Sequence, residues 1–319
     1  MRILICPLNW GLGHATRCVP IIRKFVSEGH EVLLAADGFP LEFLKSEFPG
    51  LKMLELPSYA VQYSEGNTQV GAMIRSLPNI LRGIYREHNW LRGLLKTEHF
   101  DLVISDNRFG LWTKRTECIY MTHQLMIKMP EGLKMFEPLA WWLHRQIINR
   151  FSTCWIPDYE EKNGFSGDLA HKYRLPLNAK FVGPLTRFLP PETYKPDTSH
   201  DVVALVSGVE PQRTLFENQM VQRFANSKEK VLILTGKPAT KNNRLQIGNI
   251  SFATHIADAE LASYLLGAKK IISRSGYSTI MDLHQLKCLQ KAEFIPTPGQ
   301  TEQEYLAEYI NKFQVAYSI

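Results

Sequence analysis

IISRSGYSTIMDLHQLKCLQKAEFIPTPGQTEQE, residues 271–304, is the stretch that decides the fold of this chain. Short apolar runs alternate in it with polar turns and helical patterns. The expected elements are a strand end (271–273), a polar turn (274–276), a helix (277–286), a second strand (292–295), a loop (296–299) and a helix from 301. This order is typical of a parallel α/β unit.

Polar residues in this stretch lie where such a unit binds its ligands. Parallel α/β units bind ligands at the carboxyl ends of strands, where helix N-termini direct backbone N–H groups toward anions. Asp282, one turn into the helix, is placed to accept a hydrogen bond from a sugar hydroxyl. In a second interpretation, Ser275 and Ser278 only cap the helix. The candidate ligands are Ser275, Gly276, Ser278, Thr279, Asp282, Gln303 and Glu304.

The composition bounds the class of protein. A length of 319 residues suggests about two domains, and 45% hydrophobic residues with 21% charged residues are typical of a soluble globular protein. No apolar run would span a bilayer and no signal peptide precedes the first strand pattern, so a cytoplasmic protein is predicted. Five cysteines without a CxxC pair predict reduced thiols and no zinc site. A net charge of +6 suits an anionic ligand or an anionic membrane surface, and no nucleic-acid-binding motif is present.

The first half opens with a strand–helix–strand pattern over residues 2–36. The loop Gly11-Leu12-Gly13-His14 follows the first strand. Its glycines serve either a tight turn or the close approach of backbone to a phosphate or sugar. Asp106-Asn107 and His123-Gln124 each follow a later predicted strand, so they are expected to point into the cleft of an open sheet.

The second half begins after residues 190–199, which are rich in Pro, Thr and Asp and are predicted to link two domains. Three strands are then predicted, at 202–206, 231–234 and 250–253. The candidate ligands at their ends are Ser207, Gly208, Thr235, Gly236 and Ile256. Together these strand ends predict a pocket for a phosphate and a sugar.

Two segments of the first half, residues 77–96 and 133–151, combine apolar stripes with arginines. The first is interpreted either as a packed helix with a solvated basic face or as a membrane-surface contact. Most of the second is expected to be core. One of the adjacent residues Trp141 and Trp142 is expected to be exposed or at an interface.

These patterns resemble the two-domain glycosyltransferases of the GT-B fold. The closest resemblance is to the MurG-type enzymes, which add N-acetylglucosamine to a lipid-linked acceptor in peptidoglycan synthesis, and it covers the chain from end to end. Residues 274–282, RSGYSTIMD, match that family's RSGAxTxxE donor motif, with Asp282 in place of its glutamate. Gln303 matches a sugar-contacting glutamine, whereas Glu304 replaces the family's next glutamine. Residues 183–187, GPLTR, are similar to the family's GNPVR, Ser207-Gly208 stand at its GGSxG loop, and Gly13-His14 match the end of its GGTGGH loop.

The resemblance implies an α/β architecture of two Rossmann-like, parallel-sheet domains facing a central cleft. Residues 1–185 would bind the acceptor and residues 186–319 the donor, with a final helix or tail packed back on the first domain. The implied reaction is inverting transfer of a hexose or N-acetylhexosamine from a nucleotide sugar, UDP-linked, to a hydroxyl of a lipid-linked or glycan acceptor in cell-envelope polysaccharide synthesis. The implied location is the cytoplasm, with peripheral contact to the inner face of the plasma membrane.

The resemblance also implies roles for single residues. His14 is expected to be the base, although it could instead orient phosphate or be a loop histidine bonded to backbone. Arg187 and Arg274 belong to the donor side, where arginine and helix ends would bind the leaving diphosphate without a metal or a cofactor. The residues expected on the acceptor side are Gly11, Gly13, Asp106, Asn107, His123 and Gln124.

Three further functions remain open from the sequence. The first is that of the nucleotide-sugar hydrolases of pseudaminic acid synthesis, which share this architecture and a GxGHxxR loop similar to residues 11–17 here. In such an enzyme His14 would activate water instead of an acceptor hydroxyl. The second is a non-hydrolysing nucleotide-sugar epimerase, and the third is a catalytically silent nucleotide-sugar binder.

Overall fold

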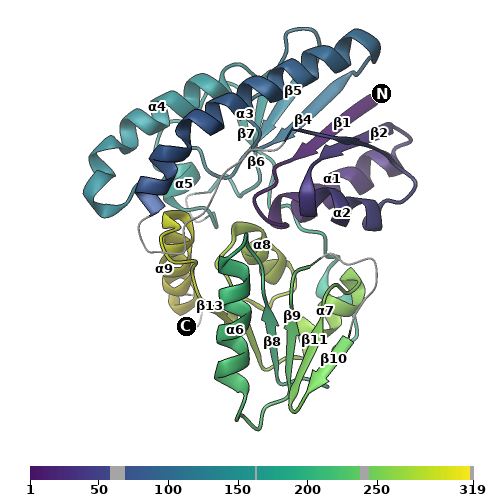
Figure 1. Ribbon diagram of the computed structural model, residues 1–319, viewed down its shortest axis with the longest axis vertical. Helices are drawn as coiled ribbons and strands as arrows, with labels where there is room; N and C mark the ends of the chain where they lie inside the picture. The colour runs from purple at the N-terminus through teal and green to yellow at the C-terminus, as the bar shows by residue number, and fades with distance from the viewer. Residues whose placement is uncertain (58–68, 162–163, 238–243, 317–319) are drawn as a thin grey trace. The chain divides into compact units, whose positions relative to one another are not determined.

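The computed structural model of the protein describes residues 1–57, 69–161, 164–237 and 244–316. The chain divides into two compact units (Figure 1). The first contains Met1–Asn9 and His14–Leu185, and the second contains Trp10–Gly13 and the chain from Thr186 onward. Each unit has its own sheet and its own hydrophobic core.

The described residues of the first unit form a sheet of seven parallel strands in the order β3-β2-β1-β4-β5-β6-β7. The strands are β1 (Arg2–Pro7), β2 (Glu31–Ala36), β3 (Lys52–Glu55), β4 (Leu102–Asp106), β5 (Glu117–Met121), β6 (Thr153–Ile156) and β7 (Ala179–Phe181). The strand order reverses at β1, which has β2 on one side and β4 on the other. In doubly wound sheets, ligands bind beyond the carboxyl ends of the strands at this reversal.

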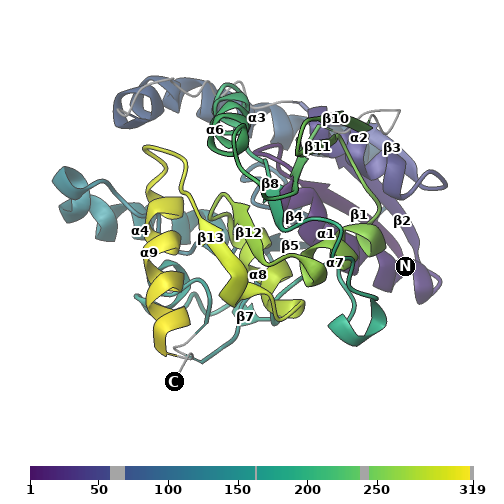
Figure 2. The same ribbon diagram turned by 90° about the horizontal axis from the view of Figure 1, so that it is seen from below.

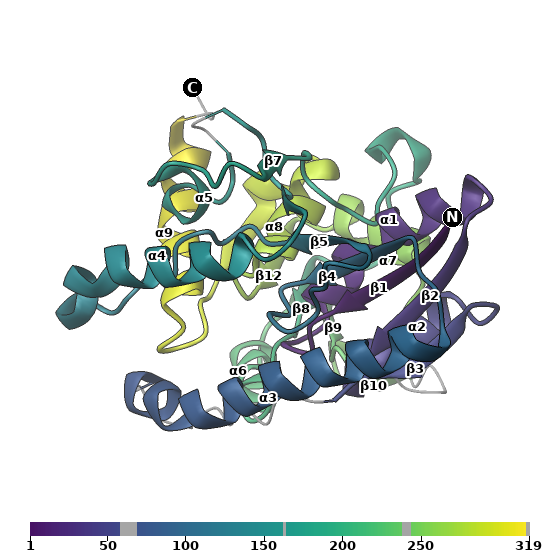
Figure 3. The same ribbon diagram turned by 90° about the horizontal axis from the view of Figure 1, so that it is seen from above.

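Helices cover this sheet. They are α1 (Gly13–Ser27), α2 (Gly38–Glu47), α3 (Gln69–Thr97), the 3-10 helix η1 (Glu131–Phe136), α4 (Glu137–Ile148) and α5 (Asp168–His171). Helix α3 spans 29 residues and runs along the sheet (Figures 1 and 3). Its Leu91 is fully buried in the core that also contains Leu4 and Val103.

The described part of the second unit has a six-stranded sheet in the order β10-β11-β9-β8-β12-β13. The strands are β8 (Val202–Leu205), β9 (Val231–Leu234), β10 (Arg244–Ile247), β11 (Ile250–Ala253), β12 (Lys270–Ser273) and β13 (Ala292–Phe294). The helices are η2 (Pro191–Thr193), α6 (Gln212–Phe224), α7 (Asp258–Gly267), α8 (Tyr277–Gln285), η3 (Leu289–Lys291) and α9 (Thr301–Ala316). Only β10 pairs antiparallel among these strands, and β12 and β13 lie side by side in Figure 2.

The predicted α/β class with two parallel-sheet domains is confirmed. One correction concerns α3, which begins at Gln69, whereas the sequence predicts a loop as far as residue 71 and a helix start near Pro78. Pro78 lies inside the helix, because the packing of the long apolar stripe outweighs one unfavourable residue. Of the loop predicted at residues 59–71, residues 59–68 lie outside the described residues.

A second correction concerns α4, whose apolar stripe was predicted to be core. Instead the helix buries Glu137, His144 and Ile148. His144 determines which face of the helix is buried. Its Nδ1 lies 3.2 Å from the Leu125 carbonyl oxygen, and its Nε2 lies 3.1 Å from the Tyr120 hydroxyl. The expectation of one exposed tryptophan is confirmed, since Trp142 is 51% exposed while Trp141 stacks on Tyr173.

A third correction concerns the predicted linker at 190–199, which packs within the second unit. The Asp197 amide donates a hydrogen bond to the Ser263 carbonyl at 2.8 Å. For the predicted tail, residues 317–319 lie outside the described part of the chain. None of the described helices is both long and apolar enough to cross a membrane.

The contact between α3 and the segment after β4 generates a testable prediction. A Cβ added at Gly110 would lie 2.3 Å from the Ile84 carbonyl oxygen and 2.7 Å from the Glu87 Cβ, whereas one added at Gly93 would meet nothing within 4 Å. Gly110→Ala should therefore lower the free energy of unfolding by about 1–3 kcal/mol. Gly93→Ala, in the same helix as Ile84 and Glu87, should leave it unchanged or raise it by about 0.5–1 kcal/mol. Urea denaturation of both variants measures the difference, and equal effects would contradict the packing.

Candidate active site

The first unit holds a buried charged cluster where β1 and β4 end. Arg17 and Asp106 are 2% and 0% exposed and form an ion pair. The Arg17 Nε donates to both carboxylate oxygens at 3.0 Å, and one terminal nitrogen also bonds the same carboxylate. Asp106 is the last residue of β4 and pairs with Pro7 at the end of β1. The cluster thus occupies the point where the strand order reverses.

His14 and His123 are attached to this ion pair. The His14 Nδ1 lies 3.1 Å from the Asp106 Oδ2 and 2.9 Å from the Arg17 Nη2. The Arg17 Nη1 lies 3.0 Å from the Nδ1 of the buried His123. The side chain of His14 remains 13% exposed. The structure therefore brings together three predicted residues, His14, Asp106 and His123.

Arg17 is the member of the cluster that the sequence-based prediction of the site omitted. His14 and Arg17 lie three residues apart on α1, so they share one face of the helix. That spacing was visible in the sequence as part of the GxGHxxR pattern, but a basic residue in a helix usually indicates a solvated face. The burial of Arg17 depends on its contact with Asp106, 89 positions later, and the sequence around Arg17 does not indicate that contact.

The electrostatics of the cluster follow from burial and pairing. Burial alone would raise the pKa of Asp106, but Arg17 and His14 outweigh it and lower the pKa to about 2. Burial lowers the pKa of His14, and the positive charge of Arg17 adds to this effect, although Asp106 opposes both. At neutral pH, Asp106 is therefore a carboxylate and His14 is a neutral imidazole that can accept a proton.

The remaining residues predicted for the acceptor side make other contacts. The Asn107 Oδ1 accepts a hydrogen bond from the Tyr120 hydroxyl at 2.9 Å, and the Gln124 amide donates to the Thr122 Oγ1 at 3.1 Å. Gly11 has a φ of +86°, a conformation that favours glycine, and Gly13 begins α1.

In the second unit, Asp282 and Arg187 lie close together. The Thr186 hydroxyl donates to the Asp282 Oδ1 at 2.7 Å, and the Arg187 Nε lies 3.8 Å from the Asp282 Oδ2. Arg187 also forms an ion pair with Asp258 at 3.0 Å. Burial raises the pKa of Asp282 to about 6, against the opposing effects of Arg187 and Thr186. Thr186 and Asp258 were not among the predicted site residues.

The predicted strand-end residues of the second unit lie at one edge of its sheet. β11, β9 and β8 are parallel neighbours, and their carboxyl ends lead into Ile256, Thr235-Gly236 and Ser207-Gly208. Gly236 has a φ of +63°, and a Cβ there would lie 2.3 Å from the Val206 carbonyl oxygen. Only glycine therefore allows these two strand ends to approach so closely.

Residues 274–276 connect the end of β12 to the start of α8. Gly276 is the N-cap, and Ser278 and Thr279 lie in the first turn, where backbone N–H groups lack helical partners. The guanidinium of Arg274 is turned inward, bonded to the carbonyls of Pro296 at 2.8 Å and Ile295 at 3.3 Å. Burial lowers its pKa to about 10. Arg274 therefore supports the loop after β13 from within.

Gln303 and Glu304 hold the loop that precedes α9. The Gln303 Oε1 accepts from the Thr297 amide and the Glu304 Oε1 from the Gly299 amide, both at 2.9 Å. The Ser275 hydroxyl donates to the Gln303 carbonyl at 2.7 Å, which ties this loop to the end of β12. Within the described chain, no group of three or more His, Cys, Asp or Glu side chains could hold a metal ion.

Comparison with known proteins agrees with this architecture. No protein-family model matches the chain. An uncharacterized glycosyltransferase from Methanosarcina mazei is 22% identical over 98% of this chain and 84% of its own length. Among solved structures, the glycotransferase of kitacinnamycin has a TM-score of 0.55 at 16% identity, covering 98% of this chain and 94% of its own. A Streptomyces glycosyltransferase complexed with thymidine diphosphate has a TM-score of 0.50 at 13% identity, covering 98% and 96%.

The solved structures establish the fold, which is that of glycosyltransferases of the GT-B type. The prediction that the chain is an enzyme of the glycosyltransferase class is confirmed by the curated relative from Methanosarcina mazei, which is named a glycosyltransferase. Their names give no specific support to a MurG-type enzyme.

The raised pKa of Asp282 predicts a pH-dependent difference in stability. Its pKa of about 6 in the folded chain exceeds the usual 3.8, so the folded state binds more protons between these values. The contribution of Asp282 to the free energy of unfolding is therefore fully present below pH 4 and is lost as the pH rises through 6. Asp282→Asn removes the effect, so the variant should gain roughly 2–3 kcal/mol relative to the wild type between pH 4 and pH 7.5. Urea denaturation at both pH values tests this, and a pH-independent difference between the two proteins would contradict it.

Proposed function

We propose that the protein is an inverting glycosyltransferase with His14 as its base. The donor is a nucleotide sugar, UDP-linked, that carries a hexose or N-acetylhexosamine. The acceptor is a hydroxyl of a lipid-linked or glycan molecule, as in the MurG-type enzymes of cell-envelope polysaccharide synthesis. The observation that carries the proposal is the buried contact of His14 with Asp106 and Arg17, because it fixes an imidazole at the strand reversal of the first sheet.

The proposed base requires one tautomer of His14. With the proton on Nδ1, the ring donates to the Asp106 carboxylate and leaves the Nε2 lone pair for an acceptor hydroxyl. In this tautomer the Arg17 Nη2 makes no hydrogen bond to Nδ1, and Arg17 acts on the ring through their common partner Asp106. Among the described residues, none is hydrogen-bonded to that Nε2. Asp106 then stabilises the imidazolium that forms as the hydroxyl attacks the anomeric carbon of the donor. Arg17 keeps Asp106 ionised, which the lowered pKa of this carboxyl supports.

The second unit would bind the donor and receive the leaving diphosphate. Asp282, which accepts from Thr186 through Oδ1 and has the Arg187 Nε 3.8 Å from Oδ2, would bind a ribose hydroxyl. Arg187 and the first turn of α8 supply positive charge and backbone N–H groups for phosphate oxygens. These groups neutralise the charge that develops as the bond to the sugar breaks, so the proposal needs neither a metal nor a cofactor.

Replacing His14 tests the proposed base. His14→Ala should lower kcat about 10²–10⁴-fold and leave the dissociation constant for the donor nucleotide unchanged. His99→Ala, at a side chain that is 81% exposed, is the matched control and should retain full kcat. In the wild type, the acid limb of kcat/KM should lie below pH 6.5, because burial lowers the pKa of His14. Full activity in His14→Ala would show that another group is the base.

We further propose that the first unit touches an anionic membrane surface. Five large apolar side chains of η1 and α4 are about half exposed or more, and this part of the unit projects beyond the strands (Figure 3). They are Met135, Phe136, Leu139, Trp142 and Leu143. On α3, Arg82, Arg86 and Arg92 are exposed and form no ion pair with any described residue. Apolar insertion together with cationic side chains is typical of interfacial binding.

Vesicle sedimentation tests this contact. The protein should bind phosphatidylglycerol vesicles at low salt and be released as salt rises, because each arginine near an anionic surface contributes about 1 kcal/mol. Changing Arg82, Arg86 and Arg92 together to Gln should weaken binding. The control triple variant, in which Lys45, Lys114 and Arg115 are changed to Gln, removes the same charge elsewhere and should bind as the wild type does. If both triple variants lose vesicle binding equally, the protein is attracted to the vesicles by its net charge alone and not through α3.

A further inference from the structure

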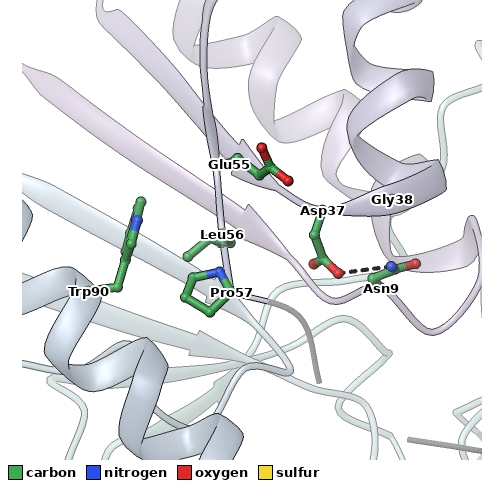
Figure 4. Close-up of a pocket in the computed structure, with 7 residues that line it drawn as sticks. All are labelled: Asn9, Asp37, Gly38, Glu55, Leu56, Pro57 and Trp90. Carbon is green, nitrogen blue, oxygen red and sulfur yellow. Dashed lines mark hydrogen bonds between the residues drawn. The ribbon is translucent and has the colours of Figure 1, made fainter. Parts of the chain in front are cut away.

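A pocket of about 540 Å³ lies in the first unit, where β1, β2 and β3 end (Figure 4). Trp90 of α3 lies on one side of it, and Asn9 and Asp37 lie on the other, with Leu56 and Pro57 between them. Its volume falls within the ~300–1,000 Å³ that is usual for small-molecule sites. None of its lining residues was predicted from the sequence to belong to a site.

The polar side of the pocket is held in place. The Asn9 Nδ2 donates to the Asp37 Oδ2 at 2.9 Å, and the Asp37 Oδ1 is paired with the fully buried Arg108. Gly38, with a φ of +54°, makes room for Asn9, because a Cβ there would lie 2.5 Å from the Asn9 Nδ2. A preorganised amide and carboxylate at this wall can bind a ligand without losing further side-chain freedom.

The charge of the pocket selects the class of ligand. Arg108 is shared by two buried carboxylates, Asp37 and Glu87, so this group carries an excess negative charge. Glu55, exposed at the end of β3, adds a carboxylate that has no hydrogen-bond or ion-pair partner among the described residues. No Lys or Arg is among the described residues that line the pocket. Phosphates and carboxylates would be repelled, whereas groups that donate hydrogen bonds would be attracted.

The opposite wall is aromatic and apolar. Trp90 is half-buried and packs against the core of the unit, which fixes the plane of its indole. The indole lies across the pocket from the Asp37 carboxylate, and this pair of walls matches the two kinds of surface on a sugar ring (Figure 4). The C–H face of the ring packs on the indole, and the hydroxyls at its edge donate to the oxygens.

We propose that this pocket binds an uncharged sugar ring of the acceptor, stacked on Trp90 and hydrogen-bonded through its hydroxyls to Asp37 and Glu55. The term acceptor rests on the proposed transfer function, whereas binding of the sugar ring does not. The acceptor would then be a molecule that already carries a neutral sugar or an N-acetylated amino sugar. A diphosphate or a bare lipid alcohol is excluded from this pocket.

Saturation-transfer NMR with the full chain tests the pocket. The probes are the methyl glycosides of glucose, galactose, mannose and N-acetylglucosamine, with glucose 6-phosphate as the anionic probe. At least one neutral glycoside should bind saturably, and glucose 6-phosphate should bind more weakly. If no glycoside binds, or if the phosphate binds best, the proposal is overturned.

Variants locate the binding. Glu55→Lys changes an exposed charge at a strand end and should weaken the glycoside at least about tenfold. Trp90→Ala should do the same, whereas Trp142→Ala, at the exposed tryptophan of α4, should not. Melting temperatures check that the variants fold, and Glu55→Lys keeps the test valid if Trp90→Ala does not. Unchanged glycoside binding in Glu55→Lys would place the sugar elsewhere and contradict the proposal.

Nucleotide binding separates this proposal from the proposed function. A thermal-shift panel of UDP-, GDP- and dTDP-sugars reports the second unit independently of the pocket. Donor binding should be unaffected by Glu55→Lys in either case. Transfer to a glycoside acceptor that is also unaffected by Glu55→Lys would refute the pocket and leave the function standing. Glycoside binding that depends on Glu55 and Trp90, in a protein that never transfers a sugar, would refute the function and leave the pocket standing.

Discussion

The buried ion pair of Arg17 with Asp106 is the interaction on which the charged cluster of the first unit depends. It joins α1 to the end of β4, and both histidines of the cluster take their positions from it. Removing one partner of a buried pair costs about 3–5 kcal/mol, because the remaining charge is left without compensation. The pair therefore fixes the position of His14 beside Asp106, and burial keeps that imidazole neutral.

A second buried arginine has the same kind of role at the ends of β1 and β2. Arg108 donates to the Pro7 carbonyl at 2.9 Å and to Glu87 of α3 at 2.8 Å, and it also pairs with Asp37. The carboxyl edge of the first sheet is thus built on two guanidinium groups. One supports a proton acceptor, and the other supports a pocket rich in hydrogen-bond acceptors.

The fold could be predicted from the sequence because its signals are local. Strands such as 231–234 and 250–253 are short apolar runs that end in polar turns, and the structure has them at the same residues. The face of α4 could not be predicted, because it depends on hydrogen bonds of His144 to distant elements. Arg17 was missed for the same reason, since a buried arginine is recognised only by a distant partner. The pocket was missed because its walls come from four separate segments.

The central claim is transfer of a sugar with inversion, and product analysis tests it most directly. The donor selected by thermal shift would be incubated with an acceptor glycoside, and the products would be followed by mass spectrometry and by NMR of the anomeric proton. The account predicts one new glycoside for each nucleoside diphosphate released, with its anomeric configuration opposite to that of the donor. Release of free sugar whether or not an acceptor is present would show a hydrolase, and a retained configuration would contradict direct displacement with His14 as the base.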